Sequence, residues 1–261
     1  MSNTTQIQSR DNALLKELRR LVHANTEYRK QGRFWVEGDH LLRAGLDRGI
    51  RPVIGVFAQS SWVNLAPLWG QIASKTVLVS DDLYDDLSAL ESPARMGFVF
   101  ELPAPQVVQA QTATVILDRV QDAGNVGAIL RSASAFGFRQ VLALTGTAAL
   151  WSPKVLRAGM GAHWGLHLHE GLSVEVLSEL AMPLMVTSSH RGEFLHHMLE
   201  QRQLPMPCAW ALGHEGQGVC HAVADLAGYH VRIAQPGGEE SLNVASAAAI
   251  CLHASATAAV V

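Results

Sequence analysis

The first long segment of the chain, residues 11–34, carries apolar side chains at the three- and four-residue spacing of one helix face. Lys16, Arg19 and Arg20 fall on the opposite side of the same helix. The pattern therefore predicts an amphipathic helix with a basic outer face. Its apolar positions are Leu14, Leu15, Leu18, Leu21 and Val22.

Short apolar runs then alternate with helical patterns up to residue 102. Strands are predicted at 34–38, 52–58 and 95–102, and a helix at 39–49. The segment 74–90 is predicted to be a strand followed by a helix that begins at Ser80. Residues 102–112, rich in Pro, Gln and Ala, have no sustained period. We therefore predict a domain at 1–101, a linker at 102–112 and a second domain at 113–261.

The second domain shows nearly continuous Val, Ile and Leu runs separated by helical segments. Such runs are typical of a parallel sheet covered on both faces, so we predict an α/β fold. The predicted strands are 112–118, 139–146, 165–170, 183–189, 207–213 and 230–235. The predicted helices are 125–136, beginning at Asn125, then 153–159, 173–180 and 243–258.

Composition narrows the class of protein. The 261 residues are 48% hydrophobic and 16% charged, enough apolar material for a substantial core. Three cysteines without metal-type spacing favour a reducing, cytoplasmic setting over a disulfide framework. The polar first residues show no secretory signal. The Ala-rich tail from residue 244 is a weak candidate for a membrane span, and we expect a buried helix there and no membrane association.

Charge is distributed unevenly along the chain. The net charge is −3, but residues 1–52 hold ten Lys or Arg against six Asp or Glu, and are +4. Residues 53–261 are correspondingly −7. A basic N-terminal part can be a phosphate-binding surface or an ordinary solvated helix face, and both interpretations stay open.

Three polar loops follow predicted strands, where open parallel sheets bind ligands. The first, 117–137, has Gly124 to Gly127 at a helix start and Arg131 on the next turn. The second, 210–219, contains three glycines and Glu215, so backbone can approach a ligand closely. The third places Ser241-Leu242-Asn243 before the last helix, where the triad can cap the helix or serve a site.

Familiar phosphate and metal patterns are missing from the sequence. Neither G-x-G-x-x-G after a strand nor G-x-x-x-x-G-K-[ST] occurs, so a nicotinamide or ATP enzyme is disfavoured. His163, His167 and His169 invite a metal interpretation. Without a Cys/His cluster at ligand spacing, we predict that they are solvent-facing strand histidines and that no metal binds.

Together the three loops resemble the motifs of the SpoU (TrmH-type) family of RNA 2′-O-ribose methyltransferases, in the SPOUT superfamily. The first motif, N-x-G-x-x-x-R, is matched by Asn125, Gly127 and Arg131. The second is matched by Gly213, Glu215, Gly216 and Gly218. The third is matched by Ile233, Gly237, Ser241, Leu242, Asn243 and Val244. One departure is clear, because Ala234-Gln235 stands where the family usually has Pro-Met.

The resemblance implies a parallel-sheet α/β catalytic domain with a C-terminal trefoil knot, preceded by an N-terminal helix and a small ribosomal-protein-like RNA-binding domain. It also implies a homodimer and S-adenosyl-L-methionine as the methyl donor. The implied cofactor-binding residues are Leu212, Gly213, Gly218, Ile233, Ala234, Leu242 and Asn243. The implied catalytic residues are Arg131, Asn125, Glu215, Ser241 and Asn243, with Arg131 as a phosphate clamp because a guanidinium scarcely deprotonates.

The function implied is methylation of a ribose 2′-OH in structured RNA, with 23S ribosomal RNA preferred because of the additional N-terminal domain. Two alternatives share the fold: a transfer RNA ribose methyltransferase and a non-catalytic RNA-binding protein. A nucleotide-dependent α/β enzyme unrelated to the family is a third, and it lacks the phosphate-loop pattern that it would need.

Overall fold

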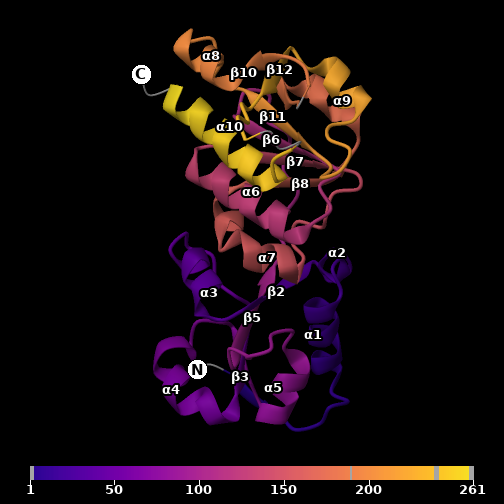
Figure 1. The fold of residues 1–261 in the computed structure, drawn as a ribbon. Helices are drawn as coiled ribbons and strands as arrows, with labels where there is room; N and C mark the ends of the chain where they lie inside the picture. Colours follow the sequence, from indigo (N-terminus) through magenta and orange to yellow (C-terminus); the bar gives the residue numbers. More distant parts are fainter. Residues whose placement is uncertain (1–2, 189, 238–240, 259–261) are drawn as a thin grey trace. The chain divides into compact units, whose positions relative to one another are not determined.

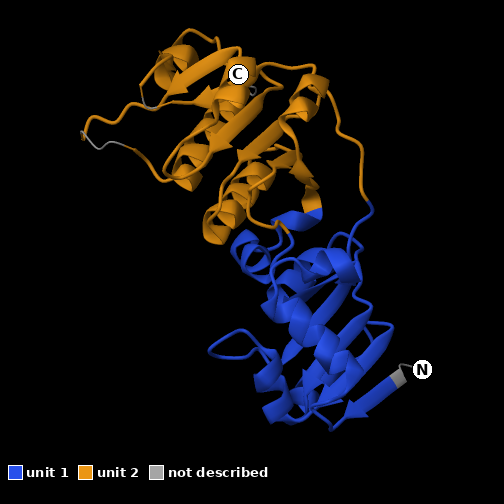
Figure 2. Ribbon diagram, turned by 90° about the vertical axis from the view of Figure 1, so that its right-hand side faces the viewer, with its two compact units in different colours: residues 1–104, 151–164 blue, residues 105–150, 165–261 orange. Residues whose placement is uncertain are grey.

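A computed structural model describes residues 3–188, 190–237 and 241–258. The chain forms two compact units, coloured separately in Figure 2. The first comprises residues 1–104 and 151–164, and the second comprises residues 105–150 and 165–261. A segment from the second half of the sequence therefore belongs to the first unit. The chain passes from one unit to the other three times, and the first passage, at residues 104–105, lies within the Pro-containing stretch predicted as a linker.

The first unit is built on a five-stranded mixed sheet of order β1-β4-β3-β5-β2. Strands β1, β4 and β3 are parallel, whereas β5 is antiparallel to both of its neighbours. The strands are β1 (Asn3–Ile7), β2 (Arg33–Glu37), β3 (Ile54–Ala58), β4 (Lys75–Val79) and β5 (Met96–Glu101). The helices are α1 (Ala13–His23), α2 (Glu27–Gln31), α3 (Asp39–Leu46), α4 (Gln59–Trp69), α5 (Asp81–Leu87) and α7 (Pro153–Gly159).

Aromatic packing explains why residues 151–164 belong to the first unit. The rings of Trp151 and Trp164 lie 4.7 and 5.6 Å from the ring of Phe34 on β2, measured between centroids. The indole N–H of Trp164 also donates to the carbonyl of Leu41 at 3.0 Å. Such contacts between large aromatic side chains stabilise beyond the area that they bury.

The second unit is built on a seven-stranded sheet of order β10-β12-β9-β11-β6-β7-β8, in which every pair is parallel. The predicted parallel α/β fold is thus confirmed for this unit (Figure 1). The strands are β6 (Thr114–Asp118), β7 (Gln140–Leu144), β8 (His167–Leu172), β9 (Leu184–Thr187), β10 (Glu193–Phe194), β11 (Ala209–Gly213) and β12 (Tyr229–Arg232). The helices are α6 (Ala123–Ala135), α8 (Leu195–Glu200), α9 (His221–Leu226) and α10 (Val244–Ala258), with the 3₁₀ segment η2 (Val174–Glu179). A second 3₁₀ segment, η1 (Ala162–Gly165), lies where the chain passes from the first unit to the second.

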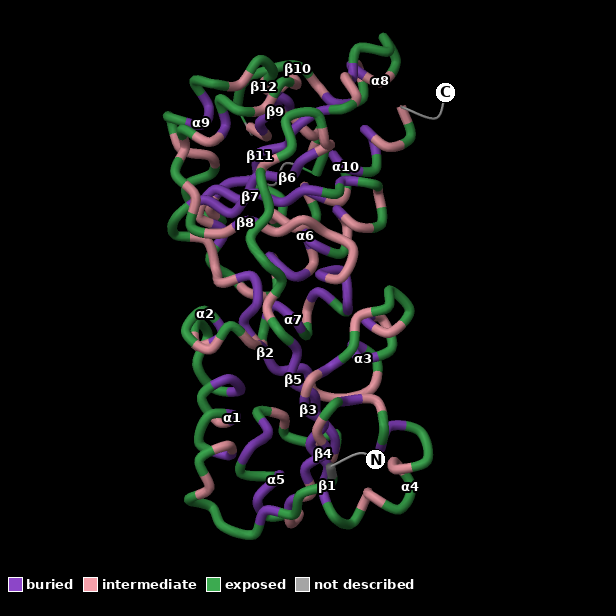
Figure 3. The backbone as a smooth tube through the Cα atoms, turned by 180° about the vertical axis from the view of Figure 1, so that it is seen from behind, coloured by how far each residue is buried: buried purple, intermediate pink, exposed green. Residues whose placement is uncertain are grey.

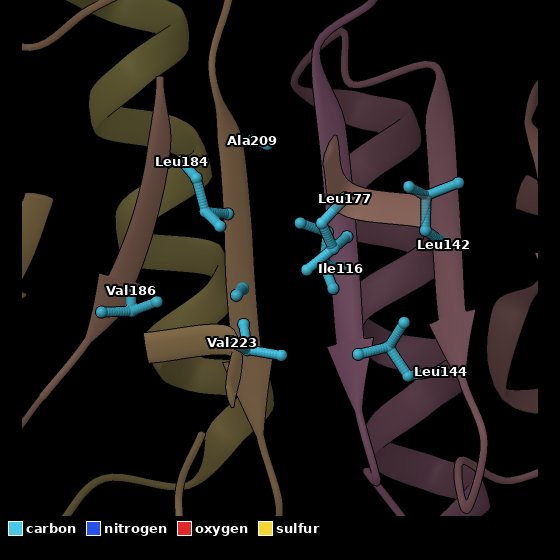
Figure 4. Close-up of a cluster of buried hydrophobic side chains, with 9 residues drawn as sticks. Ile116, Leu142, Leu144, Leu177, Leu184, Val186, Ala209 and Val223 are labelled. Atoms are coloured by element: carbon cyan, nitrogen blue, oxygen red, sulfur yellow. The ribbon is translucent and has the colours of Figure 1, made fainter. Parts of the chain in front are cut away.

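Both faces of the parallel sheet are covered. On one face Ile116, Leu142 and Val186 pack with side chains from η2 and α9, as Figure 4 shows. On the other face α10 packs on α6 and β11, and the Trp210 indole N–H donates to Ser255 Oγ at 2.9 Å. The central strands β6, β7 and β11 are accordingly buried at every position, whereas β8, β10 and β12 are partly exposed (Figure 3). This double coverage matches the continuous apolar runs of the sequence.

Several local predictions need correction. Helix α6 begins at Ala123 rather than Asn125, because Asp122 Oδ1 accepts the Asn125 N–H at 2.7 Å and caps the helix earlier. The helix predicted at 173–180 is the 3₁₀ segment η2. Residue 189, the end of a predicted strand, lies outside the described residues. The helical segment predicted at 11–34 is divided into α1 and α2, with Ala24 as the C-cap of α1. The short elements β1, β10, α8 and α9, and α4 with its internal Pro67, were not predicted.

The histidines of 163–169 do not face solvent as predicted. His163 and His169 are 2% and 8% exposed, and His167 is half-buried. A side chain on Gly159 would lie 2.5 Å from His163, so this glycine makes room for the histidine ring. Burial, followed by the charge of His167, lowers the pKa of His169.

Candidate active site at the carboxyl edge of the parallel sheet

The register of the second sheet brings the ends of four strands together. Gly213 at the end of β11 pairs with Asp118 at the end of β6. Thr187, which ends β9, pairs with Val231 of β12, one residue before that strand ends. Because the four strands are parallel and adjacent, the loops that follow them meet at one edge, where α/β proteins bind ligands.

The first loop runs from β6 into α6. Asn125 lies in the first turn of α6, and Gly127 is buried one turn along. Arg131 lies further along the same helix and is exposed. Within the part of the chain that the structure describes, its guanidinium makes no hydrogen bond or ion pair. The cation is therefore available to an anionic ligand.

The second loop, 214–219, folds back tightly on the end of β11. His214 N donates to Gly218 O at 3.1 Å, and Gly218 N donates to His214 O at 2.8 Å. A Cβ on Gly213 would lie 2.0 Å from the carbonyl carbon of Gly218. Gly218 itself has a φ of 66°, which disfavours other residues. Glycine at these two positions is a steric requirement of the turn.

Glu215 joins the second loop to the first. Its Oε1 accepts from Asn125 Nδ2 at 3.1 Å and from Asp122 N at 3.1 Å, and its Oε2 accepts from Gln121 N at 3.3 Å. Partial burial acts to raise the pKa of Glu215, but these hydrogen bonds together outweigh it, and the pKa lies below its ordinary value. The carboxylate thus stays ionised while it orients Asn125.

The third loop reaches the same group through Asn243. Its Nδ2 donates to Asn125 Oδ1 at 2.9 Å. Its Oδ1 accepts from Ala245 N at 2.9 Å and from Ser246 N at 3.2 Å, which makes Asn243 the N-cap of α10. The side chain therefore caps the last helix, one of the two roles that the sequence left open, and it also continues a chain of hydrogen bonds from Asn243 through Asn125 to Glu215.

A cavity of about 690 Å³ lies among these loops. It is lined by the predicted residues Gly213, Glu215, Gly218, Ile233, Ser241 and Leu242. Leu212, Ala234, Asn243, Asn125 and Arg131 do not line it. Asn125 and Asn243 join the site through the hydrogen bonds above, Leu212 is buried in β11, and Ala234 and Arg131 are exposed.

Other residues of the site were missed by the sequence analysis. Ser188, His190 and Arg191 line the cavity from the loop after β9, and the end of that strand was the available signal. Gln235 also lines it, and its Oε1 is shielded without a hydrogen-bond partner. Arg119, directly after β6, contacts the second loop, and no residue pattern indicated this.

Among residues 3–188, 190–237 and 241–258, no group of three or more His, Cys, Asp or Glu side chains could hold a metal ion. Within those ranges, no helix has both the length and the apolar character needed to cross a bilayer.

Many cations of the N-terminal part are engaged in ion pairs within the first unit. Arg19 lies 2.7 Å from Asp86, Arg33 lies 3.0 Å from Glu101, and Arg43 lies 2.9 Å from Asp39, measured between N and O atoms. A phosphate would therefore compete with carboxylates for several of the ten Lys and Arg residues in this part of the chain.

Fold and site together define an α/β protein with a glycine-lined ligand cavity at the carboxyl edge of a parallel sheet. The sequence profile of the SpoU rRNA Methylase family matches residues 112–253, and the chain belongs to this family. The family resemblance inferred from the three motifs is thereby confirmed.

Some known proteins are similar to this chain in sequence, and some solved structures have a similar fold. The Bacillus subtilis 23S rRNA (guanosine(2553)-2′-O)-methyltransferase RlmP is 28% identical over 95% of this chain and 98% of its own. A Porphyromonas gingivalis structure described as a putative RNA methyltransferase of the TrmH family superposes with a TM-score of 0.79 at 28% identity, over 95% of this chain and 98% of its own. The Streptomyces viridochromogenes SpoU methyltransferase AviRb, solved with AdoMet, has the same fold, with a TM-score of 0.81 at 22% identity, over 95% and 98%.

Proposed function

We propose that this protein transfers a methyl group from S-adenosyl-L-methionine to a ribose 2′-OH of ribosomal RNA, with 23S RNA as the substrate. The observation that carries the proposal is the hydrogen-bonded group Asn243–Asn125–Glu215 beside a glycine-lined cavity, with the exposed Arg131 on the same helix as Asn125. Family membership and the names of the relatives, which act on ribosomal RNA, support the same reaction. The tRNA and non-catalytic alternatives have less support.

The cavity fits the cofactor. Its volume of about 690 Å³ lies within the range of about 300–1,000 Å³ typical of small-molecule sites. Gly213 and Gly218 line it without side chains, and Ile233 and Leu242 supply apolar walls for a purine ring. Backbone N–H and C=O groups fix the orientation of a ligand in an otherwise apolar site. Bound there, S-adenosyl-L-methionine would supply an electrophilic methyl group.

The chain's own residues would then orient the nucleophile. Arg131, exposed and without a partner among the described residues, would hold a phosphate of the target nucleotide and stabilise negative charge developing on the 2′ oxygen. Asn125 is held rigid by Glu215 and Asn243 on either side, so the start of α6 would present a fixed edge to the ribose. Ser241 lines the cavity and would contact the ribose.

The proposal extends to assembly, topology and location. The family implies a homodimer with the active site near its interface and a trefoil knot around the cofactor. It also implies an RNA-binding role for the N-terminal domain 1–101. Ile250 on α10 and Leu242 before it are 40% and 38% exposed, which is consistent with a contact surface there. The cytoplasm is the compartment that ribosomal RNA implies. Sedimentation of the purified protein would test the dimer directly.

The deciding experiment is transfer of labelled methyl from S-adenosyl-L-methionine to unmodified ribosomal and transfer RNA pools, followed by 2′-O-methyl mapping. We expect label in one ribosomal ribose. Arg131→Lys should lower kcat about 100-fold while binding of S-adenosylhomocysteine is unchanged, because the lost clamp acts on RNA. Arg139→Lys, an exposed arginine outside the site, is the control. Equal loss of cofactor affinity in Arg131→Lys would contradict the clamp role.

The other outcomes separate the alternatives. Label confined to transfer RNA would establish that substrate instead. RNA binding without cofactor binding would support the non-catalytic protein. Tight binding of a nicotinamide or ATP without S-adenosylhomocysteine binding would revive the unrelated nucleotide enzyme.

A further inference from the structure

Arg119 has an unusual backbone conformation directly after β6. Its φ of 59° lies in the left-handed region, which is unfavourable for a residue other than glycine. Two hydrogen bonds hold it there. Arg119 N donates to Thr147 Oγ1 at 3.1 Å, and Thr147 Oγ1 donates to Leu117 O at 2.8 Å.

The Arg119 guanidinium extends to the second loop. Nη1 donates to Gln217 Oε1 at 2.9 Å, and Nη2 donates to Gly218 O at 3.4 Å. Nε donates to Asp118 Oδ1 at 3.0 Å. Asp118 is only 2% exposed, and its other oxygen accepts from Cys220 N at 2.6 Å. Arg119 and Asp118 thus hold the second loop at 217–218 and at its end.

This attachment is separate from the one made by Glu215. Glu215 reaches from the second loop to the first, whereas Arg119 reaches from the first loop to the second. Both Gln217 and Gly218 line the cavity, and within the second loop Gly218 is also bonded to His214. The Arg119 side chain therefore connects Gln217 and Gly218, which form one wall of the cavity, to the edge of the sheet at the end of β6.

We propose that Arg119 is a positioning residue that holds the Gln217–Gly218 wall in place and thereby sets the affinity of the cavity for S-adenosyl-L-methionine. The inference rests on the proposed function. Arg119 does not line the cavity, so it acts on the cofactor through Gln217 and Gly218. Turnover at saturating cofactor should depend on it little, because Asn125, Glu215 and Arg131 lie beyond its contacts.

Calorimetric binding of S-adenosylhomocysteine and steady-state kinetics with RNA test this role together. Arg119→Met keeps the alkyl chain that packs near Gly146 but removes all donors. We expect its Kd for S-adenosylhomocysteine and its KM for the methyl donor to rise about tenfold, with kcat within about threefold of wild type. Arg119→Lys keeps the charge and should recover part of the affinity. Arg139→Met should bind as wild type does.

A double-mutant cycle with Gln217 identifies the route of the effect. Gln217→Ala alone should weaken binding, and adding it to Arg119→Met should weaken binding by much less than the two single effects combined. Independent effects would contradict an action through Gln217. A lower melting temperature with unchanged Kd and KM would show a merely structural role, and a fall in kcat alone would place Arg119 on the RNA. Either result overturns the proposal.

The same measurements separate this inference from the function on which it rests. Wild-type protein that binds no S-adenosylhomocysteine would overturn the proposed function and this inference with it. Wild-type binding combined with unchanged affinity in Arg119→Met would overturn the role of Arg119 alone.

Discussion

Gly97 in the first unit and Gly213 in the second both occupy strand positions where a side chain would not fit. A Cβ on Gly97 would lie 2.0 Å from Trp35 Cζ2, so the obstacle there is a neighbouring side chain. A Cβ on Gly213 would lie 2.0 Å from the backbone of Gly218, so the obstacle there is the loop itself. The first glycine serves packing, and the second allows a loop to fold over the end of a strand.

Charged residues also have different kinds of partner in the two units. In the first unit Arg19, Arg33 and Arg43 pair with carboxylates of that unit. In the second, Glu215 and Arg119 connect two loops of the site, and Arg131 has no partner among the described residues. These arginines of the first unit therefore form ion pairs on the surface of their own unit, whereas Glu215 and Arg119 of the second unit connect loops at the edge of its sheet.

The largest effect is expected for Gly213→Ala. Because backbone cannot move aside as a side chain can, we expect the free energy of unfolding to fall by about 3 kcal/mol or more, with loss of S-adenosylhomocysteine binding. Chemical denaturation and calorimetry would measure both. A variant with near wild-type stability and affinity would remove the distinction between the two glycines.

Gly97→Ala should also destabilise the protein, but this defect should be relieved by making room. In the Trp35→Leu background the indole is gone, so we expect the added Cβ to cost about 1–3 kcal/mol less than it does in the wild type. Denaturation of the two single variants and the double variant would measure this coupling. Additive effects would mean that Trp35 is not the obstacle. S-adenosylhomocysteine binding by the folded Gly97→Ala protein should be unchanged.

The lowered pKa of Glu215 leads us to expect that the stability of the protein depends on pH. Its folded pKa lies below the ordinary value of 4.5, so its contribution to stability is present above pH 4.5 and is lost as the pH falls through the folded pKa. The melting temperatures of wild type and Glu215→Gln should therefore differ near neutral pH and converge in acid. A constant difference across that range would argue against the carboxylate as the cause.

Asp81 is the matched carboxylate in the first unit, where hydrogen bonding by Ser60 lowers the pKa. Asp81→Asn should show the same kind of pH dependence in its melting temperature. It should leave S-adenosylhomocysteine affinity unchanged, whereas Glu215→Gln should weaken it. Equal losses of affinity would break the comparison between the units.

The smallest effect is expected at the position where the chain departs from its family. Gln235 Oε1 is shielded and accepts no hydrogen bond from a described residue. Replacing Gln235 with Met, the residue usual in the family, removes this unsatisfied oxygen and should raise the free energy of unfolding by about 1 kcal/mol. Denaturation would measure the gain, and a loss of stability would show that the carboxamide is satisfied in solution.

The sequence by itself determined the parallel α/β character of the second unit and the three loops of its site. Strands such as β6 and β11 are buried at every position because both sheet faces are covered, and the run of apolar residues inside each can be recognised without a structure. The residues Asn125, Glu215 and Asn243 were likewise recognisable from ordered motifs.

Only the tertiary structure decided which of those residues touch. Asn243 and Asn125 are 118 positions apart, and Arg119 and Gln217 are 98 apart, and their contacts depend on strand order and register. The membership of residues 151–164 in the first unit has the same origin, because Trp151 and Trp164 pack on Phe34 far away in the sequence. Local patterns specify helices and strands, but a contact between distant residues is set by how the whole chain packs.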